Sequence, residues 1–157
     1  MRKQILRTSA ALAIAAGMTL AATGTSHGLD VTRPRDGQDP ISSGCMSDGR
    51  IVKQKTDKYY SSRYHEHVKV TASLWYSRSC RTVWAMVDHT VPTNHWSGMG
   101  CNIWRNSDMK HYTCNHKTGT SEMLSPMLND KNVTGFATAW AYDGNDPHQM
   151  FARTGSY

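Results

Sequence analysis

Three polar residues in the middle of the chain have the types and the order of a nuclease site: His89, Asn106 and His116. In nucleases of the His-Asn-His type, one histidine activates water, the asparagine orients it, and a later histidine helps to hold a divalent metal over the scissile phosphate. Against this interpretation, the chain has no Cys-x-x-Cys pair, and the stretch before His116 lacks a helical period. We therefore keep a metal-dependent nuclease as an alternative and interpret these residues as turn and surface residues.

A second arrangement, His65-Glu66-His67, could coordinate a metal ion. Residues two apart on a strand share a face, so two imidazoles placed in this way would point to the same side. A third ligand is needed, and the sequence indicates none. We interpret the segment as a solvated strand end and predict neither a metal site nor a cofactor.

Basic and aromatic side chains are interleaved between residues 50 and 69. Cations neutralise phosphates while rings stack on bases or sugars, so such a segment can follow a polyanion, including the teichoic acids found outside a cell. A solvated hairpin whose charges discourage edge pairing is the other interpretation. The binding candidates in this segment are Lys53, Lys55, Lys58, Tyr59, Tyr60, Arg63 and Tyr64.

The five tryptophans are a further candidate surface, because aromatic faces stack on sugar rings. Trp84 and Trp140 lie in strongly alternating strand patterns, which predicts that both belong to the core. Trp96 lies in a segment with Gly98 and Gly100; it is the tryptophan that we expect to be exposed, and it joins the binding candidates. The sequence shows no Gly-x-Ser-x-Gly elbow and no acid pair placed as in a glycosidase.

These residues are carried by a chain whose beginning is typical of an export signal. Residues 1–28 start with Arg2, Lys3 and Arg7, continue with an apolar run, and end in small residues, which predicts a signal peptide cleaved between Ala22 and Gly28. The whole chain has 18 Lys and Arg against 12 Asp and Glu. Removal of the three basic residues of the signal lowers the net charge from +6 to +3. We expect a secreted, extracellular protein without stable membrane insertion, and nucleic acid is a disfavoured partner.

All four cysteines lie in the expected mature part, residues 29–157, which we interpret as one domain. An even number of cysteines in an exported chain predicts two disulfides, and three pairings are possible. We favour Cys45–Cys80, which would tie the amino-terminal segment to the central sheet, and Cys101–Cys114, which would close a short hairpin-like loop.

Alternation of apolar and polar residues predicts strands in most of this part. The clearest is at residues 68–76, followed by a turn at 77–81 and a returning strand at 82–88. Trp75 and Trp84 lie opposite the apolar sets of these strands, so we expect both faces of the hairpin to be covered. Residues 29–44 are predicted to be coil, 91–100 a loop, and 118–125 a turn or one helical turn. Further strands are predicted at 50–56, 102–105, 110–114, 133–142 and 149–153. The fold class is therefore all-β: a small disulfide-stapled sandwich or barrel of short antiparallel strands.

Four segments also have a familiar sequence: residues 36–45, 74–85, 125–130 and 152–157. Together they resemble the YjfA-like proteins, small secreted proteins of Gram-positive bacteria that form a domain of unknown function. The resemblance implies an exported, disulfide-stapled domain with Cys45 and Cys80 at the two core cysteine positions, and it implies no activity. The chain lacks the extra cysteine pair that many members carry before Asp36, and Trp75 stands where an arginine is usual.

From these observations we expect a secreted, non-enzymatic, monomeric domain that binds an extracellular or cell-envelope partner, either an anionic polymer or a protein. The metal-dependent nuclease of His89, Asn106 and His116 is the first alternative. A secreted enzyme inhibitor, acting through the rigid loop at residues 91–100, is the second.

Overall fold

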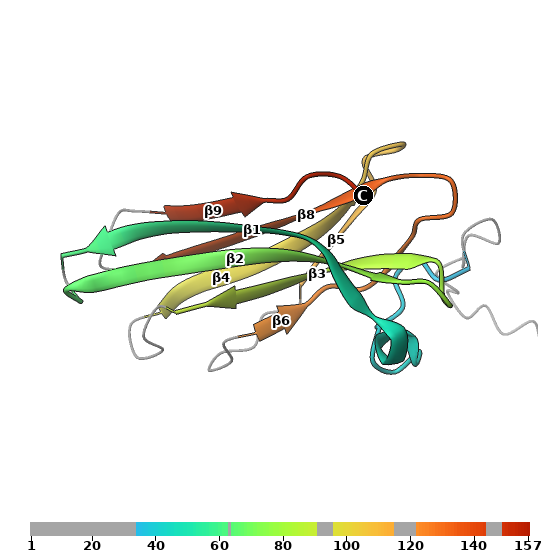
Figure 1. Cartoon of the computed structure of the whole chain (residues 1–157), viewed down its shortest axis with the longest axis horizontal. Helices are drawn as coiled ribbons and strands as arrows, with labels where there is room; N and C mark the ends of the chain where they lie inside the picture. The colour runs from blue at the N-terminus through green and yellow to red at the C-terminus, as the bar shows by residue number, and fades with distance from the viewer. Residues whose placement is uncertain (1–33, 63, 91–95, 115–121, 144–148) are drawn as a thin grey trace, which may run out of the picture.

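The computed structural model describes residues 34–62, 64–90, 96–114, 122–143 and 149–157. Two antiparallel sheets pack face to face as a β-sandwich (Figure 1). In the first sheet the strand order is β1-β2-β3-β6, with β7 also paired to β3, and in the second it is β5-β4-β8-β9. The predicted all-β class with antiparallel strands is confirmed, in its sandwich form. The proposed signal, residues 1–28, lies outside the described residues.

The strands of the first sheet are β1 (Arg50–Ser61), β2 (Glu66–Ser77), β3 (Thr82–His89), β6 (Glu122–Leu124) and β7 (Leu128–Asn129). Those of the second sheet are β4 (Trp96–Arg105), β5 (His111–Thr113), β8 (Gly135–Asp143) and β9 (Gln149–Arg153). A short 3₁₀ helix, η1 (Cys45–Asp48), precedes β1. No helix in the described part of the chain has the length and apolar character needed to cross a membrane.

Period-two alternation sends one side of each central strand into the space between the sheets. The apolar set of β2, Val68 to Leu74 at every second position, is fully buried there, as are Val83, Ala85 and Val87 of β3. The second sheet presents small side chains to them, namely Ala137, Ala139 and Ala141 of β8. Because alanines fill the core side of β8, its large residues lie on the other side of the strand.

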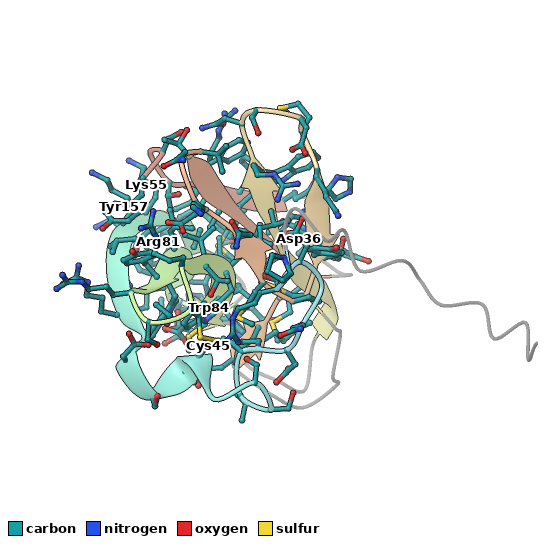
Figure 2. All side chains as sticks on the ribbon, turned by 90° about the vertical axis from the view of Figure 1, so that its right-hand side faces the viewer. Asp36, Cys45, Lys55, Arg81, Trp84 and Tyr157 are labelled. Carbon is teal, nitrogen blue, oxygen red and sulfur yellow. A yellow bond between two sulfur atoms is a disulfide. The ribbon has the colours of Figure 1, made fainter. Side chains whose placement is uncertain are left out.

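The outer side of the first sheet is covered as well, which confirms the expectation for the hairpin. Trp75 and Trp84 are cross-strand neighbours whose rings stack with centroids 6.0 Å apart. Trp84 is fully buried in a small cluster with Cys45 and Met127. Figure 2, which looks along the strands, shows Cys45 beside Trp84 at the outside of the first sheet.

The amino-terminal segment supplies that cover; its described residues, 34–44, form neither helix nor strand, in agreement with the coil predicted there. It is fixed by two backbone hydrogen bonds to one residue: the Gly37 amide donates to the Met127 carbonyl, and the Met127 amide donates to Gln38. Gly37 has a φ of 82°, which a residue with a side chain adopts at a cost. The η1 helix is an element that the sequence did not indicate.

Both favoured disulfide pairings are confirmed. Cys45 bridges to Cys80 across a Cα–Cα distance of 5.8 Å, which joins η1 to the turn between β2 and β3. Cys101 bridges to Cys114 across 5.1 Å, which joins β4 to the end of β5. No cysteine is free. Two disulfides are typical of proteins in an oxidising compartment.

Three predictions differ from the structure by more than a shift of one or two residues at the end of a strand. β1 continues to Ser61 instead of ending at Thr56, because it pairs with β2 along its whole length. β4 begins at Trp96, inside the predicted loop, because its glycines pair with β8 as strand residues. β6 occupies Glu122–Leu124, inside the predicted turn, and Met123 is buried there. With 12 residues each, β1 and β2 are also longer than the short strands that we expected.

Candidate functional site: the outer face of the second sheet

His89 and Asn106 of the nuclease hypothesis are not brought together. His89 is buried at the end of β3, so its interpretation as a turn or surface residue was wrong. It lies close to where β4 begins, whereas Asn106 follows the last residue of β4 (Figure 1). Ten strand residues at about 3.3 Å each place these two positions roughly 30 Å apart. The Asn106 amide donates instead to the hydroxyls of Thr134 and Ser156, at 2.7 and 3.0 Å. His116 lies outside the described residues.

The two histidines of the possible metal pair do not share a strand. His65 precedes β2 and has a φ of 54°, in the left-handed region, so the rule for alternate strand residues does not apply to it. His67 is exposed on β2 and meets the Tyr60 ring edge-on at 5.5 Å. In the parts of the chain that the structure describes, no group of three potential ligands is close enough to hold a metal ion.

The basic and aromatic candidates of the β1–β2 hairpin divide between two surfaces. Lys53, Lys55 and Tyr59 are the cross-strand partners of buried residues of β2. They therefore lie on the face of the first sheet that is turned toward the second sheet, on the edge strand β1. Lys58 and Tyr60 oppose Lys69 and His67 on the other side. Tyr64 packs partly against the core, and Arg63 and the side chain of Trp96 lie outside the described residues. Strand alternation therefore prevents these candidates from forming one continuous patch.

The outer face of the second sheet carries a different array, which we call the aromatic face. It is defined by the outward residues of four neighbouring strands: His111 and Thr113 of β5; Gly98, Gly100, Asn102 and Trp104 of β4; Phe136, Thr138, Trp140 and Tyr142 of β8; and Gln149, Phe151 and Arg153 of β9. No acidic side chain belongs to this set.

At one end of the aromatic face, three rings cross three strands. The Trp104 ring stacks on His111 with centroids 4.1 Å apart, and it lies nearly parallel to Phe136 at 6.1 Å. The guanidinium of Arg153 continues this row, because its Cζ lies 4.0 Å from the centre of the Phe136 ring. Cation–π contact thus holds the charged group flat against the sheet.

A polar row follows next along the strands. The Thr113 hydroxyl donates to the Asn102 side-chain oxygen at 2.8 Å, and the Asn102 amide donates to the Thr138 hydroxyl at 3.4 Å. These side chains hold one another in place; Thr138 is buried, whereas Asn102 and Thr113 are accessible and retain further hydrogen-bonding capacity for a ligand. Polar groups therefore separate the first ring row from the rings beyond it.

Beyond the polar row, two rings lie over two glycines. A Cβ built on Gly100 would stand 2.6 Å from the Trp140 ring, and one on Gly98 would stand 2.8 Å from Tyr142. Only glycine permits this approach, so the rings cover the backbone of β4 directly. Trp140 and Tyr142 stack on each other with centroids 5.8 Å apart.

Two shallow hollows open on this face. One, of about 300 Å³, lies over the polar row and is lined chiefly by Asn102, Trp104, Thr138, Phe151 and Arg153. The other, of about 280 Å³, lies beside the rings that cover the glycines. Phe151, which lines the first hollow, is 54% exposed, more than the Trp, Tyr and other Phe residues of the face.

A buried ion network supports one end of the aromatic face. The Arg105 guanidinium binds Asp36 at 2.8 Å and Asp108 at 2.7 Å, and Lys110 reaches Asp36 at 3.2 Å. Burial opposes the charge of Arg105, but the hydrogen bonds that it donates to Asp108 and Asp36 outweigh this effect and raise the pKa of the guanidinium. The network holds the turn between β4 and β5, and with it the His111 that stacks on Trp104.

Sequence reasoning recognised that tryptophans could form a platform and singled out Trp96, whose side chain lies outside the described residues. Trp140, predicted to be core, is only half-buried and lies on the outer face, and Trp104 was not singled out. The usable signal was the pattern of β8, where alanines alternate with Phe136, Thr138, Trp140 and Tyr142. A strand with small residues on one side and large rings on the other places its rings outward when the alanine side meets the opposite sheet.

Comparison with known proteins places the chain in a family. Residues 33–142 match the model of the family described as "Protein of unknown function (DUF2690)". The chain belongs to the DUF2690 family. Over 135 residues, this DUF2690 protein is 28% identical to the "Uncharacterized protein YjfA" of Bacillus subtilis (strain 168), an alignment that covers 80% of this chain and 82% of that protein. No solved structure matches this DUF2690 protein. The matched segment includes both disulfides and the β4 and β8 parts of the aromatic face, while β9 lies beyond it.

Proposed function

We propose that this DUF2690 protein is an exported, non-enzymatic domain that binds an extracellular or cell-envelope partner through the aromatic face. One observation carries the proposal: rings, hydrogen-bonding groups and a cation gather on the outer side of a sheet whose inner side is already the core. Monomeric proteins rarely expose contiguous apolar surface without a use for it. The two disulfides support a role outside the reducing cytosol.

The aromatic face is preferred to the basic hairpin for a geometric reason. Lys53 and Lys55 lie on one side of β1 and Lys58 on the other, so a single polymer could not contact all three. On the aromatic face, by contrast, Trp104, Phe136 and Arg153 come from three adjacent strands and touch in sequence. Residues that are held by one another lose little conformational freedom when a ligand binds.

The non-enzymatic part of the proposal is supported by the separation of His89 from Asn106 along the sandwich. A plasmid-nicking assay with magnesium or manganese tests it, with His89→Ala as the matched variant. Cleavage that is lost in this variant would favour the nuclease. The inhibitor alternative rests on residues 91–100, half of which lie outside the described residues, and Trp96, Gly98 and Gly100 belong to a strand rather than to a free loop.

Binding is tested by pull-down of the mature protein on purified cell wall. Two variants are compared, each of which replaces one exposed aromatic residue by alanine. Phe151→Ala removes a ring of the aromatic face, and Tyr60→Ala removes a ring of the first sheet that is exposed to nearly the same extent, 55% against 54%. We expect Phe151→Ala to weaken binding at least about tenfold, as loss of an interface aromatic commonly does, and Tyr60→Ala to leave it unchanged. Absence of binding to any wall preparation would refute the proposal.

A further inference from the structure

The aromatic face has a direction, which runs along β4 and β8. Starting from the Trp104–Phe136 pair, the path passes the Asn102–Thr138 pair, then Trp140 over Gly100, and then Tyr142 over Gly98. Six strand steps from residue 98 to residue 104, at about 3.3 Å each, give a track roughly 20 Å long. A surface of this shape suits an extended chain better than a compact molecule.

The side chains along this track alternate between two chemistries. The Trp140 ring packs directly over Gly100 and the Tyr142 ring over Gly98, and both rings remain partly exposed to solvent. The polar row between the ring rows offers amide and hydroxyl groups, and Arg153 adds a charged donor with no acidic residue beside it on the face. A pyranose sugar has the complementary surface: its C–H face meets a negative ring face, and its rim of hydroxyls meets donors and acceptors.

We infer that the aromatic face binds a linear polysaccharide of pyranose sugars laid along β4 and β8, an inference that rests on the proposed function. Trp104 at one end and Trp140 with Tyr142 at the other are the two stacking platforms, while Phe136, which is 5% exposed, packs beside Trp104 and supports it. Asn102, held in place by the buried Thr138, binds hydroxyl groups between the platforms. Arg153 binds a hydroxyl or a carboxylate of the chain. The hollow of about 300 Å³ over the polar row is where one sugar ring sits between the platforms.

A protein partner fits this geometry less well. Energetic hot spots between proteins are aromatic or arginine anchors that fill pockets on the partner. Here Trp140 and Tyr142 pack directly against the backbone of β4, and the Arg153 guanidinium lies against Phe136. An apolar lipid surface would also leave the second amide hydrogen of Asn102 and the guanidinium N–H groups of Arg153 without acceptors, which costs free energy.

The test uses the mature protein and wall sacculi in two forms, intact and stripped of anionic polymers by acid. Soluble glycan strands, released from the stripped sacculi by an amidase so that they carry no peptide, are titrated in parallel while tryptophan fluorescence is followed. We expect binding to the stripped sacculi and to the glycan strands, with little dependence on salt. Trp104→Ala and Phe151→Ala should each weaken it about tenfold or more, whereas Trp104→Phe, which keeps a ring, should remain within about threefold and Tyr60→Ala should match the unmodified protein.

Three results would overturn the inference. Binding to intact walls that disappears on stripping and falls with salt would identify an anionic polymer as the ligand. Binding to stripped sacculi without binding to the peptide-free glycan strands would identify a peptide component. In both cases the proposed function stands while the sugar assignment fails. Absence of binding to every wall form overturns the inference and the proposed function together.

Discussion

Asp36 and Arg105, 69 residues apart in the sequence, form an ion pair inside the protein, with Oδ2 and Nη1 2.8 Å apart. Their side chains are 3% and 2% exposed. Asp36 also accepts a hydrogen bond from the Asn129 amide, so one carboxylate ties the amino-terminal segment to β4 and β7. A residue in the coil that precedes every strand is thus part of the interior of the sandwich.

Asp36→Asn should lower the free energy of unfolding by about 3–5 kcal/mol, because it leaves the buried Arg105 without one of its two counterions. Asp108→Asn is the comparison, since Asp108 is 42% exposed and water can replace it in part. We expect that variant to cost about 1 kcal/mol or less. Urea unfolding of both measures the difference, and equal costs would contradict the role assigned to burial.

Gly100→Ala should displace the Trp140 ring, because the added Cβ would lie 2.6 Å from it. We expect a loss of about 1–3 kcal/mol in the free energy of unfolding, a changed tryptophan emission spectrum, and weaker wall binding. Gly155→Ala is the matched control, since a Cβ there meets nothing within 4 Å. If the two alanine variants behave alike, Trp140 does not lie against the strand in solution.

Removal of the Cys45–Cys80 bridge should destabilise the protein more than removal of the Cys101–Cys114 bridge. The bridges close segments of 35 and 13 residues, for which the chain-entropy model gives about 4 and about 3 kcal/mol respectively. Paired alanine variants of each bridge, unfolded in guanidinium, provide the comparison. The reverse order would show that packing around Cys101 and Cys114 matters more than the length of the closed chain.

Asp48 makes the fold sensitive to acid. The Ser77 hydroxyl, the Ser79 amide and the Ser79 hydroxyl all donate to its carboxylate, and the first two of these bonds are the main reasons why the pKa of Asp48 is lowered. Because the folded-state pKa lies below its ordinary value of 3.8, the stabilisation is complete above that pH and is lost as the pH falls through the folded-state pKa. Thermal unfolding of Asp48→Asn should show a deficit near neutral pH that closes in acid. A deficit that is independent of pH would show that the charge is not responsible.

Asp130 should behave in the opposite way. Burial raises the pKa of this carboxyl, and the nearby Arg81, with Nε 3.9 Å from Oδ1, compensates only in part. Ionisation therefore costs folding free energy as the pH rises above the ordinary value of 3.8. We expect Asp130→Asn to raise the melting temperature near neutral pH and to have no such advantage below pH 3.8. A lower melting temperature at neutral pH would mean that the contact with Arg81 outweighs the cost of burial.

Much of the sandwich could be predicted from local pattern alone. The hairpin of β2 and β3 follows from strict alternation with β-branched residues, and β9 was predicted with its observed bounds, Gln149–Arg153. The start of β4 could not be predicted in this way, because Gly98 and Gly100 have the composition of a loop. They belong to a strand because Trp140 and Tyr142, about 40 residues later in the chain, cover them.

The candidate site was harder to predict than the fold, for a physical reason. Each face of β8 could be the buried one: alanines occupy one side, and Phe136, Trp140 and Tyr142 the other. Trp140 lies in a strongly alternating strand pattern, and for this reason the prediction placed it in the core. The opposite sheet already fills the interior with Val68, Val70 and Leu74, which leaves room for alanine and none for a second set of rings.

One hydrogen bond at the edge of the second sheet opposes aggregation of the protein at high concentration. The Asp57 carboxylate accepts from the Phe151 amide at 2.9 Å, on the strand that ends the second sheet. An unsatisfied amide on such a strand is where another polypeptide would begin to add itself and extend the sheet. A second polypeptide that pairs with β9 must first displace the Asp57 carboxylate from the Phe151 amide, and it must then lie close to the negative charge of that carboxylate. The protein can thus display many rings on its surface while discouraging fibrous self-association along that border.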